Sequence, residues 1–519
     1  MSSLSRRSLL VLGAAGAVAA STQRPPVALA AVPGRLPDVF TLGVASGDPT
    51  PSGVVLWTRL AAEPLAEDGL GGMPQQDLPV QWQVAEDPSF RRVVRSGETR
   101  ARAADAHSVH VEVEGLQPGR EYWYRFRCQG QLTEPARTLT APAAGATSAG
   151  LTMAVASCSQ FEHGWFTAYR HIADENPDVV LHLGDYFYEY RAGTYVAPGG
   201  NVRDHRGPET ETLAGYRQRH AQYRTDPDLQ AAHAAAPWLV VWDDHEVDNN
   251  WADEVPENPQ PYFLERRASA FRAYYENMPL RRTSVPRGID LQLYRRIEWG
   301  GLASLHMLDT RQYRDDQACG DGARTDCAEA LDPSRTITGD AQEAWLLDGM
   351  AGSTATWQVL GQQVFFSQRD FTAGAVQRFS MDGWDGYVGS RERILSGIVD
   401  RGVANPVVLT GDVHRHYACD VKADFDDPSS ATLATELVTT SITSGGNGSD
   451  TSSATDVQLA ENPHIRFANS QRGYVLARFE PEQLRADFKV LDYVTDPGSP
   501  VSTRASFVVE AGRPGLQPA

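Results

Sequence analysis

Four short apolar runs, each followed at once by a polar motif, constrain the fold of this chain more than any other feature. The runs are Leu151–Ala156, Val179–Leu183, Leu239–Trp242 and Val407–Leu409, and the motifs after them are Ser-Cys-Ser, Gly-Asp, Asp-Asp-His-Glu and Thr-Gly-Asp-Val-His. Helical stretches come after these strands, and the alternation predicts an α/β domain. In α/β sheets, functional groups collect beyond the carboxyl ends of the strands. We therefore expect the four motifs to meet in a functional site.

The residue types in these motifs favour a metal centre. A glycine before Asp185 allows a tight turn, and Tyr188 comes within reach of the same ion if that turn is helical. The run Asp243–Glu246 sets carboxylates beside an imidazole, and such like charges repel unless a cation lies among them. Asp412 and His414 share one face of an extended segment. Any one of these motifs alone would be better explained as a helix cap or a salt bridge than as a metal site. Together, at successive strand ends, they predict a metal site.

Composition limits the partners of such a site. Acidic residues outnumber basic ones by 66 to 47 among 519 residues, which gives a formal net charge of −19. A chain this acidic is a poor candidate for holding a nucleic acid by bulk charge. Phosphate chemistry would need a local site in which metal ions offset the carboxylates. The length predicts two domains rather than one.

Residues 1–30 have the features of a bacterial Tat signal peptide and are set aside from the fold. Arg6 and Arg7 precede the mildly apolar run Leu9–Ala20, and Ala28–Ala30 supplies small residues for a signal peptidase. The alternative is a membrane anchor, but the run of about 12 residues is shorter than the roughly 20 that span a bilayer. We expect export by the Tat translocase, a secreted or periplasmic mature protein, and no stable membrane span.

The five cysteines exclude a disulfide scaffold. In an oxidising compartment, Cys319 and Cys327 could close a short surface-loop disulfide, and two free thiols are the alternative. Cys128 and Cys419 suggest no role.

Before the α/β region, residues 37–140 have the alternating pattern of a β-sandwich. Apolar and polar residues alternate in short runs separated by turns, as in the fibronectin type III fold. The expected strands are Gly53–Thr58, Val80–Val84, Val109–Val113 and Tyr122–Phe126. Residues 141–149 form a low-complexity linker, and residues 150–510 are the expected catalytic domain. Thr439–Thr455, rich in Ser, Thr and Gly, indicates a mobile loop.

The order Gly-Asp-x-x-Tyr, Asp-Asp-His-Glu, Gly-Asp-x-His resembles the calcineurin-like metallophosphoesterase pattern of purple acid phosphatases. The specific resemblance is to the PhoD-like alkaline phosphatase and phosphodiesterase family. Further blocks carry it between residues 40 and about 475: Gly43–Pro49, Leu56–Arg59, Ala156–Cys158, His182–Glu189, Asp309–Tyr313 and Asp382–Tyr387. The resemblance implies a metallophosphoesterase αββα sandwich, in the α/β class, with an N-terminal fibronectin type III-like β-sandwich domain.

The same resemblance implies Fe³⁺ paired with one or two Ca²⁺ ions. The implied Fe³⁺ ligands are Cys158, Asp185, Tyr188 and His414, with Asp185 bridging the metals. Thiolate and phenolate donors suit a ferric ion better than they suit calcium. Asp244 and Asp412 stand where purple acid phosphatases have Asn and His, and carboxylates shift that site from zinc towards calcium. The alternatives are a buried structural thiol at Cys158 and core packing for Tyr188.

Other residues receive weaker assignments from the family. His245 is expected to face the substrate as an electrostatic or proton-donating group, and Arg267 to contact phosphate, although Arg266 and Arg272 are neighbours on the same helix. The alternative for Arg267 is a solvated helix face. His416 either supports the metal ligands without touching the metal or is a surface histidine. Asp309 and Arg311 are expected to brace a strand end. For Trp384, Asp385 and Tyr387, the cleft mouth and core packing are both open.

The resulting prediction is a secreted alkaline phosphatase or phosphodiesterase that hydrolyses phosphate esters with a metal-activated hydroxide. His245 would assist the leaving alkoxide, and no phosphoenzyme is expected. One alternative is a phospholipase D-like phosphodiesterase acting on phosphatidylcholine, because Tyr186 follows Asp185 where an arginine would have offered a phosphate clamp. An alternative of another class is a secreted, non-enzymatic binding or adhesion protein with structural metals.

Overall fold

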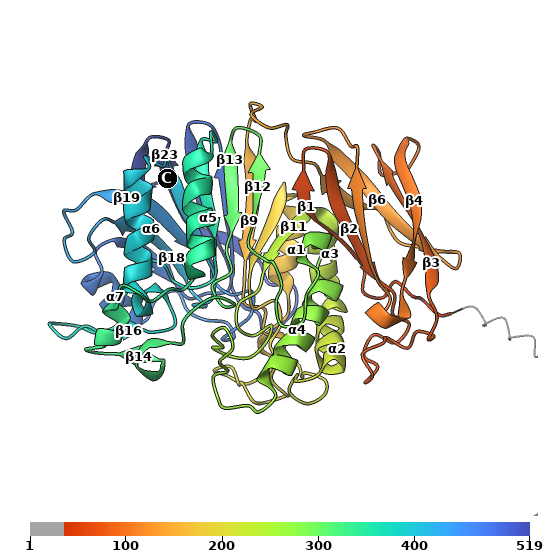
Figure 1. Ribbon diagram of the computed structural model, residues 1–519, viewed down its shortest axis with the longest axis horizontal. Helices are drawn as coiled ribbons and strands as arrows, with labels where there is room; N and C mark the ends of the chain where they lie inside the picture. Colours follow the sequence, from red (N-terminus) through yellow and green to blue (C-terminus); the bar gives the residue numbers. More distant parts are fainter. Residues whose placement is uncertain (1–35) are drawn as a thin grey trace, which may run out of the picture. The chain divides into compact units, whose positions relative to one another are not determined.

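Two large β-sheets face each other in the computed structural model, which describes residues 36–519 (Figure 1). Residues from Pro37 onward form one compact unit. The first sheet has ten strands in the order β24 (Arg513–Pro518), β23 (Val501–Glu510), β22 (Gln483–Leu491), β21 (Gly473–Phe479), β9 (Leu151–Ala156), β10 (Val179–Leu183), β11 (Pro237–Val241), β1 (Val44–Thr50), β2 (Gly53–Arg59) and β5 (Ser108–Glu114). Strands β9, β10, β11 and β1 run parallel at its centre. The signal peptide predicted at residues 1–30 lies outside the described residues.

The second sheet has seven strands. Their order is β12 (Arg295–Trp299), β13 (Ala303–Met307), β15 (Trp357–Gly361), β17 (Pro406–Thr410), β19 (Thr432–Val438), β18 (His416–Lys422) and β20 (Ile465–Asn469). Strands β13, β15, β17 and β19 are parallel. Beside it, β14 (Ala323–Arg324) and β16 (Phe379–Ser380) form a two-stranded sheet.

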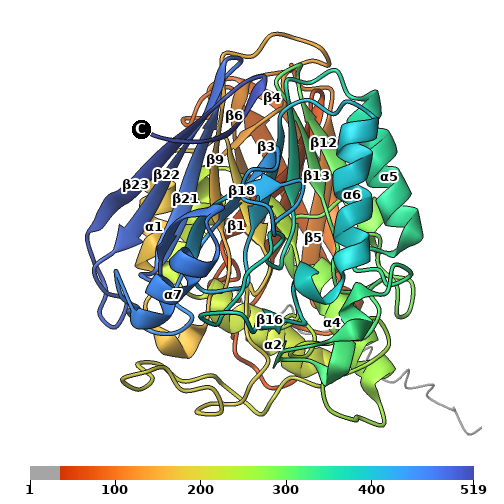
Figure 2. The same cartoon turned by 90° about the vertical axis from the view of Figure 1, so that its left-hand side faces the viewer.

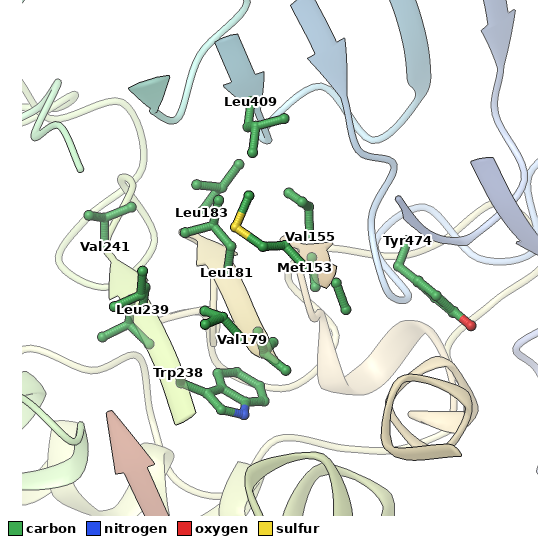
Figure 3. Close-up of a cluster of buried hydrophobic side chains, with 14 of the residues drawn as sticks. Met153, Val155, Val179, Leu181, Leu183, Trp238, Leu239, Val241, Leu409 and Tyr474 are labelled. Atoms are coloured by element: carbon green, nitrogen blue, oxygen red, sulfur yellow. The ribbon is translucent and has the colours of Figure 1, made fainter. Parts of the chain in front are cut away.

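Apolar side chains from the two sheets share one core. Leu181 and Leu183 of β10 lie close to Leu409 of β17, and all three are buried (Figure 3). Every residue of β10, β11 and β17 is buried, as expected for parallel strands covered on both faces. The predicted apolar runs are therefore confirmed as central strands.

Helices cover the outer faces of both sheets. Apolar residues of α1 (Thr167–Asp174) and α3 (Pro227–Ala235) belong to the core of the first sheet. On the other side, α5 (Gly339–Gly352) and α6 (Val388–Asp400) lie side by side and pack on the second sheet (Figure 2). The remaining helices are α2 (Leu213–Arg224), α4 (Phe263–Asn277) and α7 (Ser453–Glu461). This arrangement is the expected αββα order of layers.

The N-terminal strands are divided between two sheets. A five-stranded sheet contains β4 (Val93–Ala101), β3 (Leu78–Ala85), β6 (Glu121–Cys128) and β7 (Gln131–Leu132), with β8 (Ala136–Leu139) also paired to β6. The other N-terminal strands, β1, β2 and β5, continue the ten-stranded sheet, because Ser46 of β1 pairs in parallel with Pro237 of β11. All four strands predicted in this region are present. Because β1, β2 and β5 extend the ten-stranded sheet, one of the two N-terminal sheets is continuous with the α/β sheet.

Two further expectations concern loops and cysteines. Cys319 and Cys327 form a disulfide, with their Cα atoms 6.2 Å apart, as predicted. The segment predicted as a mobile loop at Thr439–Thr455 differs: Thr439 to Ser444 are buried, and α7 begins at Ser453. Ser/Thr-rich composition suggested solvent exposure, but the hydroxyls of Thr439, Ser441, Thr443 and Ser444 find partners inside the protein. No helix among residues 36–519 is both long and apolar enough to cross a membrane.

Candidate metal centre

The four polar motifs meet where β9, β10 and β11 of one sheet and β17 of the other end. Possible ligand atoms of Cys158, Asp185 and His414 all lie within 4.8 Å of one another, and so do those of Asp185, Asp244 and His245. Asp185 belongs to both groups. The two facing sheets therefore bring together residues that are more than 250 positions apart in the chain.

The backbone at these strand ends is held in an unusual conformation. Cys158, Asp185, Asp412 and His414 have φ values of 60°, 54°, 63° and 53°. Positive φ is uncommon for residues with a side chain, and it clusters at functional sites. Gly184 has a φ of 102°, and a Cβ there would lie 2.6 Å from the backbone nitrogen of Asp243. Glycine is thus required where β10 passes close to the end of β11.

A thiol, a phenol and an imidazole surround Asp185. The hydroxyl of Tyr188 donates to Asp185 Oδ2 at 3.0 Å and lies 3.0 Å from His414 Nε2. Ser444 donates from its hydroxyl to the Tyr188 oxygen at 2.7 Å. Burial raises the pKa of the Cys158 thiol, and the charges of Asp185 and Asp412 raise it further. Tyr188 thus joins the first ligand group, and Ser444 on the following loop is a contact that sequence reasoning missed.

Two buried carboxylates at the strand ends, Asp185 of both ligand groups and Asp412 outside them, are poorly compensated by the protein. Burial raises the pKa of Asp185 and of Asp412 well above the usual range, and Asp185 Oδ1 is buried with no hydrogen-bond partner. Buried carboxylates with raised pKa values either take up a proton or have their charge offset by a cation. These residues therefore fit a metal centre.

His245 is fixed by a glutamate that the sequence did not single out. Its Nδ1 lies 2.8 Å from Glu189 Oε2, while Glu189 Oε1 accepts a hydrogen bond from the backbone N–H of Asn249 at 3.0 Å. The rings of His245 and Tyr188 lie 4.0 Å apart. Burial lowers the pKa of His245, but the charges of Asp244, Glu189 and Asp185 outweigh it and raise that pKa. Glu189 is the last residue of the family-like block His182–Glu189, and this was the available signal in the sequence.

Arg311 braces the end of β11. Its Nε donates to Asp243 at 2.6 Å, and its two terminal nitrogens donate to Asp382 at 2.8 and 2.9 Å. Burial raises the pKa of Asp244, but the charges of His245 and Arg311 hold it below its usual range. Asp309 Oδ1 accepts hydrogen bonds from the side chain of Trp242 and the backbone of Arg311. Both residues thus brace strand ends, as predicted, and neither joins the ligand groups.

Arg267, the predicted phosphate contact, is held by partners inside the protein. Arg267 is 1% exposed; it donates to the backbone oxygen and to Oδ1 of Asp253 at 2.7 and 3.1 Å, and it stacks over Trp251 and Phe271. It does not lie on a solvated helix face, because this pair and these rings hold it inside the protein. Its contact with phosphate stays a prediction.

His416 and the Trp384–Tyr387 block also adopt structural positions. His416 is buried and accepts at Nδ1 from the backbone N–H of Thr440 at 3.1 Å, so it is not a surface histidine. Trp384 and Tyr387 are fully buried in the core beneath α6. Asp385 pairs with Arg391 at 2.7 Å. The packing alternative therefore holds for Trp384 and Tyr387, whereas Asp385 is held by its ion pair.

Comparison with known proteins identifies the family. Residues 153–488 match the family model for the PhoD-like phosphatase, and residues 28–142 match that for the PhoD-like phosphatase N-terminal domain. Alkaline phosphatase D of Bacillus subtilis (strain 168) is 52% identical over 480 residues, which are 92% of this chain and 82% of that protein. A solved structure of PhoD aligns with a TM-score of 0.92 and 52% identity, covering 94% of this chain and 93% of its own. These matches show that the chain belongs to the PhoD-like phosphatase family.

Proposed function

We propose that this chain hydrolyses phosphate esters at a centre of one Fe³⁺ and one or two Ca²⁺ ions. Membership of the PhoD-like family makes it a phosphoric ester hydrolase of the alkaline phosphatase type. The observation that carries the proposal is that Asp185 belongs to both groups of possible ligands. A carboxylate in that position suits a bridge between two cations.

The donor set supports this choice of metals. Cys158, Tyr188 and His414 would hold Fe³⁺ together with Asp185, because sulfur, phenolate and imidazole donors suit a transition metal. Asp244 and Asp412 would hold calcium, which prefers oxygen ligands. When bound, the cations would offset the negative charge of a phosphoryl group. They would also lower the pKa of a water molecule, so that hydroxide is available near neutral pH to attack the phosphorus.

The protein's own residues would orient the reaction. Glu189 engages Nδ1 of His245, which leaves Nε2 to donate a proton to the departing ester oxygen. Arg311 holds the strand end that carries Asp244 through its bond to Asp243. Arg267 is omitted from this mechanism, since it is already paired with Asp253.

Diester hydrolysis is the second candidate for the preferred reaction. Tyr186 is buried and its hydroxyl lies 3.0 Å from His233 Nε2. This position after Asp185 therefore offers no cation to clamp a monoester dianion, which supports a phosphodiesterase such as a phospholipase D-like enzyme acting on phosphatidylcholine. The family membership argues against the non-enzymatic binding alternative.

We also propose export by the Tat translocase to the periplasm or the exterior. The twin arginines at positions 6 and 7 support this route, and the Cys319–Cys327 disulfide suits an oxidising compartment. Within the mature chain, residues 37–140 would be the N-terminal β domain and residues 150–510 the catalytic domain.

The test compares an aryl phosphomonoester, an aryl phosphodiester and phosphatidylcholine at alkaline pH. The enzyme is the exported protein with its native metals, assayed with and without a calcium chelator. Chelator-sensitive turnover that returns when calcium is restored supports the proposal, and the fastest substrate identifies the preferred class. Turnover that survives complete metal removal would refute it.

A further inference from the structure

A buried arginine between β20 and β21 makes its hydrogen bonds to neutral groups. Arg472 is 4% exposed, and its two terminal nitrogens donate to the hydroxyl of Ser441 and to the backbone oxygens of Ser444 and Ser470. No carboxylate within residues 36–519 forms an ion pair with it. Burying a cation without a counter-charge is costly, so the contacts that Arg472 makes instead need an explanation.

These contacts hold one loop, residues 441–448. Arg472 Nη1 bonds both Ser441 and Ser444, and the Ser441 hydroxyl donates in turn to the backbone oxygen of Ser444 at 2.7 Å. Gly448 has a φ of 71°, and a Cβ there would lie 2.6 Å from Arg472 Nη2 and 1.8 Å from the backbone oxygen of Ser470. The loop therefore closes around the guanidinium at a position that requires glycine.

The 441–448 loop lies along the segment that carries Cys158. The backbone N–H of Ile442 donates to the backbone oxygen of Ser157 at 3.0 Å, and those of Thr443 and Ser444 donate to the backbone oxygen of Cys158 at 3.4 Å. Cys158 has a φ of 60°, a conformation that the surrounding structure must maintain. The loop held by Arg472 is thus one support of the Cys158 backbone.

The hydroxyl of Ser444 also reaches Tyr188, another implied iron ligand. Ser444 Oγ accepts from the backbone N–H of Gln160 at 3.2 Å, and it lies 2.8 Å from the backbone oxygen of Cys158 and 2.7 Å from the Tyr188 oxygen. Ser444 has one hydroxyl proton for these two acceptors. A hydrogen bond to a charged oxygen is roughly twice as strong as one between neutral groups, so a metal-bound phenolate at Tyr188 would attract that proton.

We propose that Arg472 and Ser444 are positioning residues for the iron side of the centre. Arg472 holds the 441–448 loop, the loop supports the backbone of Cys158, and Ser444 donates to the phenolate oxygen of Tyr188. Both residues act through the ligands that they hold. The inference rests on the proposed metal centre. It confines the effect to the iron ligands, because the hydrogen bonds of this loop do not extend to Asp244 on the calcium side.

The first test is Ser444→Ala in the exported protein, with iron retention against a chelator and visible absorption as readouts. We expect iron to be held roughly 10- to 100-fold less tightly. The charge-transfer absorption of the iron-bound phenolate should move to longer wavelength, because a phenolate without a hydrogen-bond donor gives up electron density more readily. The matched control is Ser304→Ala, which removes a buried hydroxyl that donates to Glu298 at 3.0 Å and should change neither readout.

The second test is Arg472→Met, which removes the anchor of the loop. It should weaken iron retention in the same way, while the calcium affinity measured by titration calorimetry stays that of the wild type. A merely structural loss would weaken the binding of both metals. The matched control, Arg391→Met, removes another buried arginine, which pairs with Asp385 at 2.7 Å, and should retain iron. If Arg472→Met fails to fold, Ser444→Ala decides.

The outcomes separate this inference from the proposed centre. Iron-loaded wild type together with unchanged iron retention and absorption in Ser444→Ala would overturn the inference and leave the centre standing. Equal loss of iron and calcium in Arg472→Met would overturn the positioning role of that arginine. Wild-type protein without iron would refute the proposed centre and the inference with it.

Discussion

Glu189 Oε2 lies 2.8 Å from Nδ1 of His245, and both side chains are buried beside the shared carboxylate Asp185. The contact fixes the orientation of the imidazole, and in the proposed mechanism its second nitrogen faces the substrate. Partners of this kind act through the group that they hold, and their loss typically costs 10- to 100-fold in activity or metal affinity.

Glu189→Gln should lower kcat by roughly 10- to 100-fold with little change in KM, because the amide holds His245 less firmly. Steady-state kinetics on an aryl phosphate ester measures both constants. Glu482→Gln, which changes an exposed glutamate, is the matched control and should leave both constants unchanged. An unaltered kcat in Glu189→Gln would show that His245 needs no such support.

Arg311→Met should destabilise the protein by about 3–5 kcal/mol, since it leaves buried carboxylates at Asp243 and Asp382 without their partner. Urea unfolding measures the change. The comparison variant is Arg401→Met, whose partner Asp348 is exposed, and an exposed pair contributes about 0–1 kcal/mol. Similar losses in the two variants would contradict the role of Arg311 as a brace.

Gly184→Ala should abolish activity or soluble expression, because the added Cβ would lie 2.4 Å from the Cβ of Asp243. Gly193→Ala is the control: its φ of 72° is also positive, but a Cβ there meets nothing within 4 Å. The control variant should lose only about 1 kcal/mol of stability. Wild-type turnover by purified Gly184→Ala would show that the strand ends are not so closely packed.

Stability should fall as the pH drops from about 6.5 to about 4. Burial lowers the pKa of His306 from 6.5 to about 4, so the unfolded chain takes up a proton in this range while the folded one does not. In the fold, Arg296 donates to His306 Nδ1 at 3.1 Å, and protonation would break that bond. The pKa difference corresponds to about 3 kcal/mol.

Urea unfolding at several pH values should therefore show a shallower acid loss in His306→Gln than in the wild type. His171→Gln, on the partly exposed side of α1, serves as the control for replacing a histidine. If His306→Gln kept the full pH dependence of the wild type, His306 would not be buried in its neutral form.

The sequence predicted the positions of residues that are determined by neighbouring residues in the chain, and it missed those that depend on contacts with distant segments. Asp185 and Asp244 could be placed together because each follows a buried strand, and the positions of such strands along the chain are readable from apolar runs. Arg267 could not be placed, because its position depends on Asp253 in a loop, a contact that the helix pattern does not encode. Ser444 was assigned to a mobile segment on composition, but its hydroxyl is bound to Tyr188 deep in the site.

The N-terminal strands show the same limit at the level of topology. Alternation predicted the strands themselves, yet it carried no information on which sheet each would join. The parallel pairing of Ser46 with Pro237 is a long-range contact, and it makes β1, β2 and β5 part of the ten-stranded sheet.

The measurement that tests the central claim most directly is the iron content of the exported protein and of two cysteine variants. Cys158→Ser removes a possible ligand, whereas Cys419→Ser removes another fully buried thiol outside the ligand groups. We predict stoichiometric iron in the wild type and in Cys419→Ser, and loss of both iron and phosphate-ester hydrolysis in Cys158→Ser. Full activity in a Cys158→Ser protein free of iron would contradict the account.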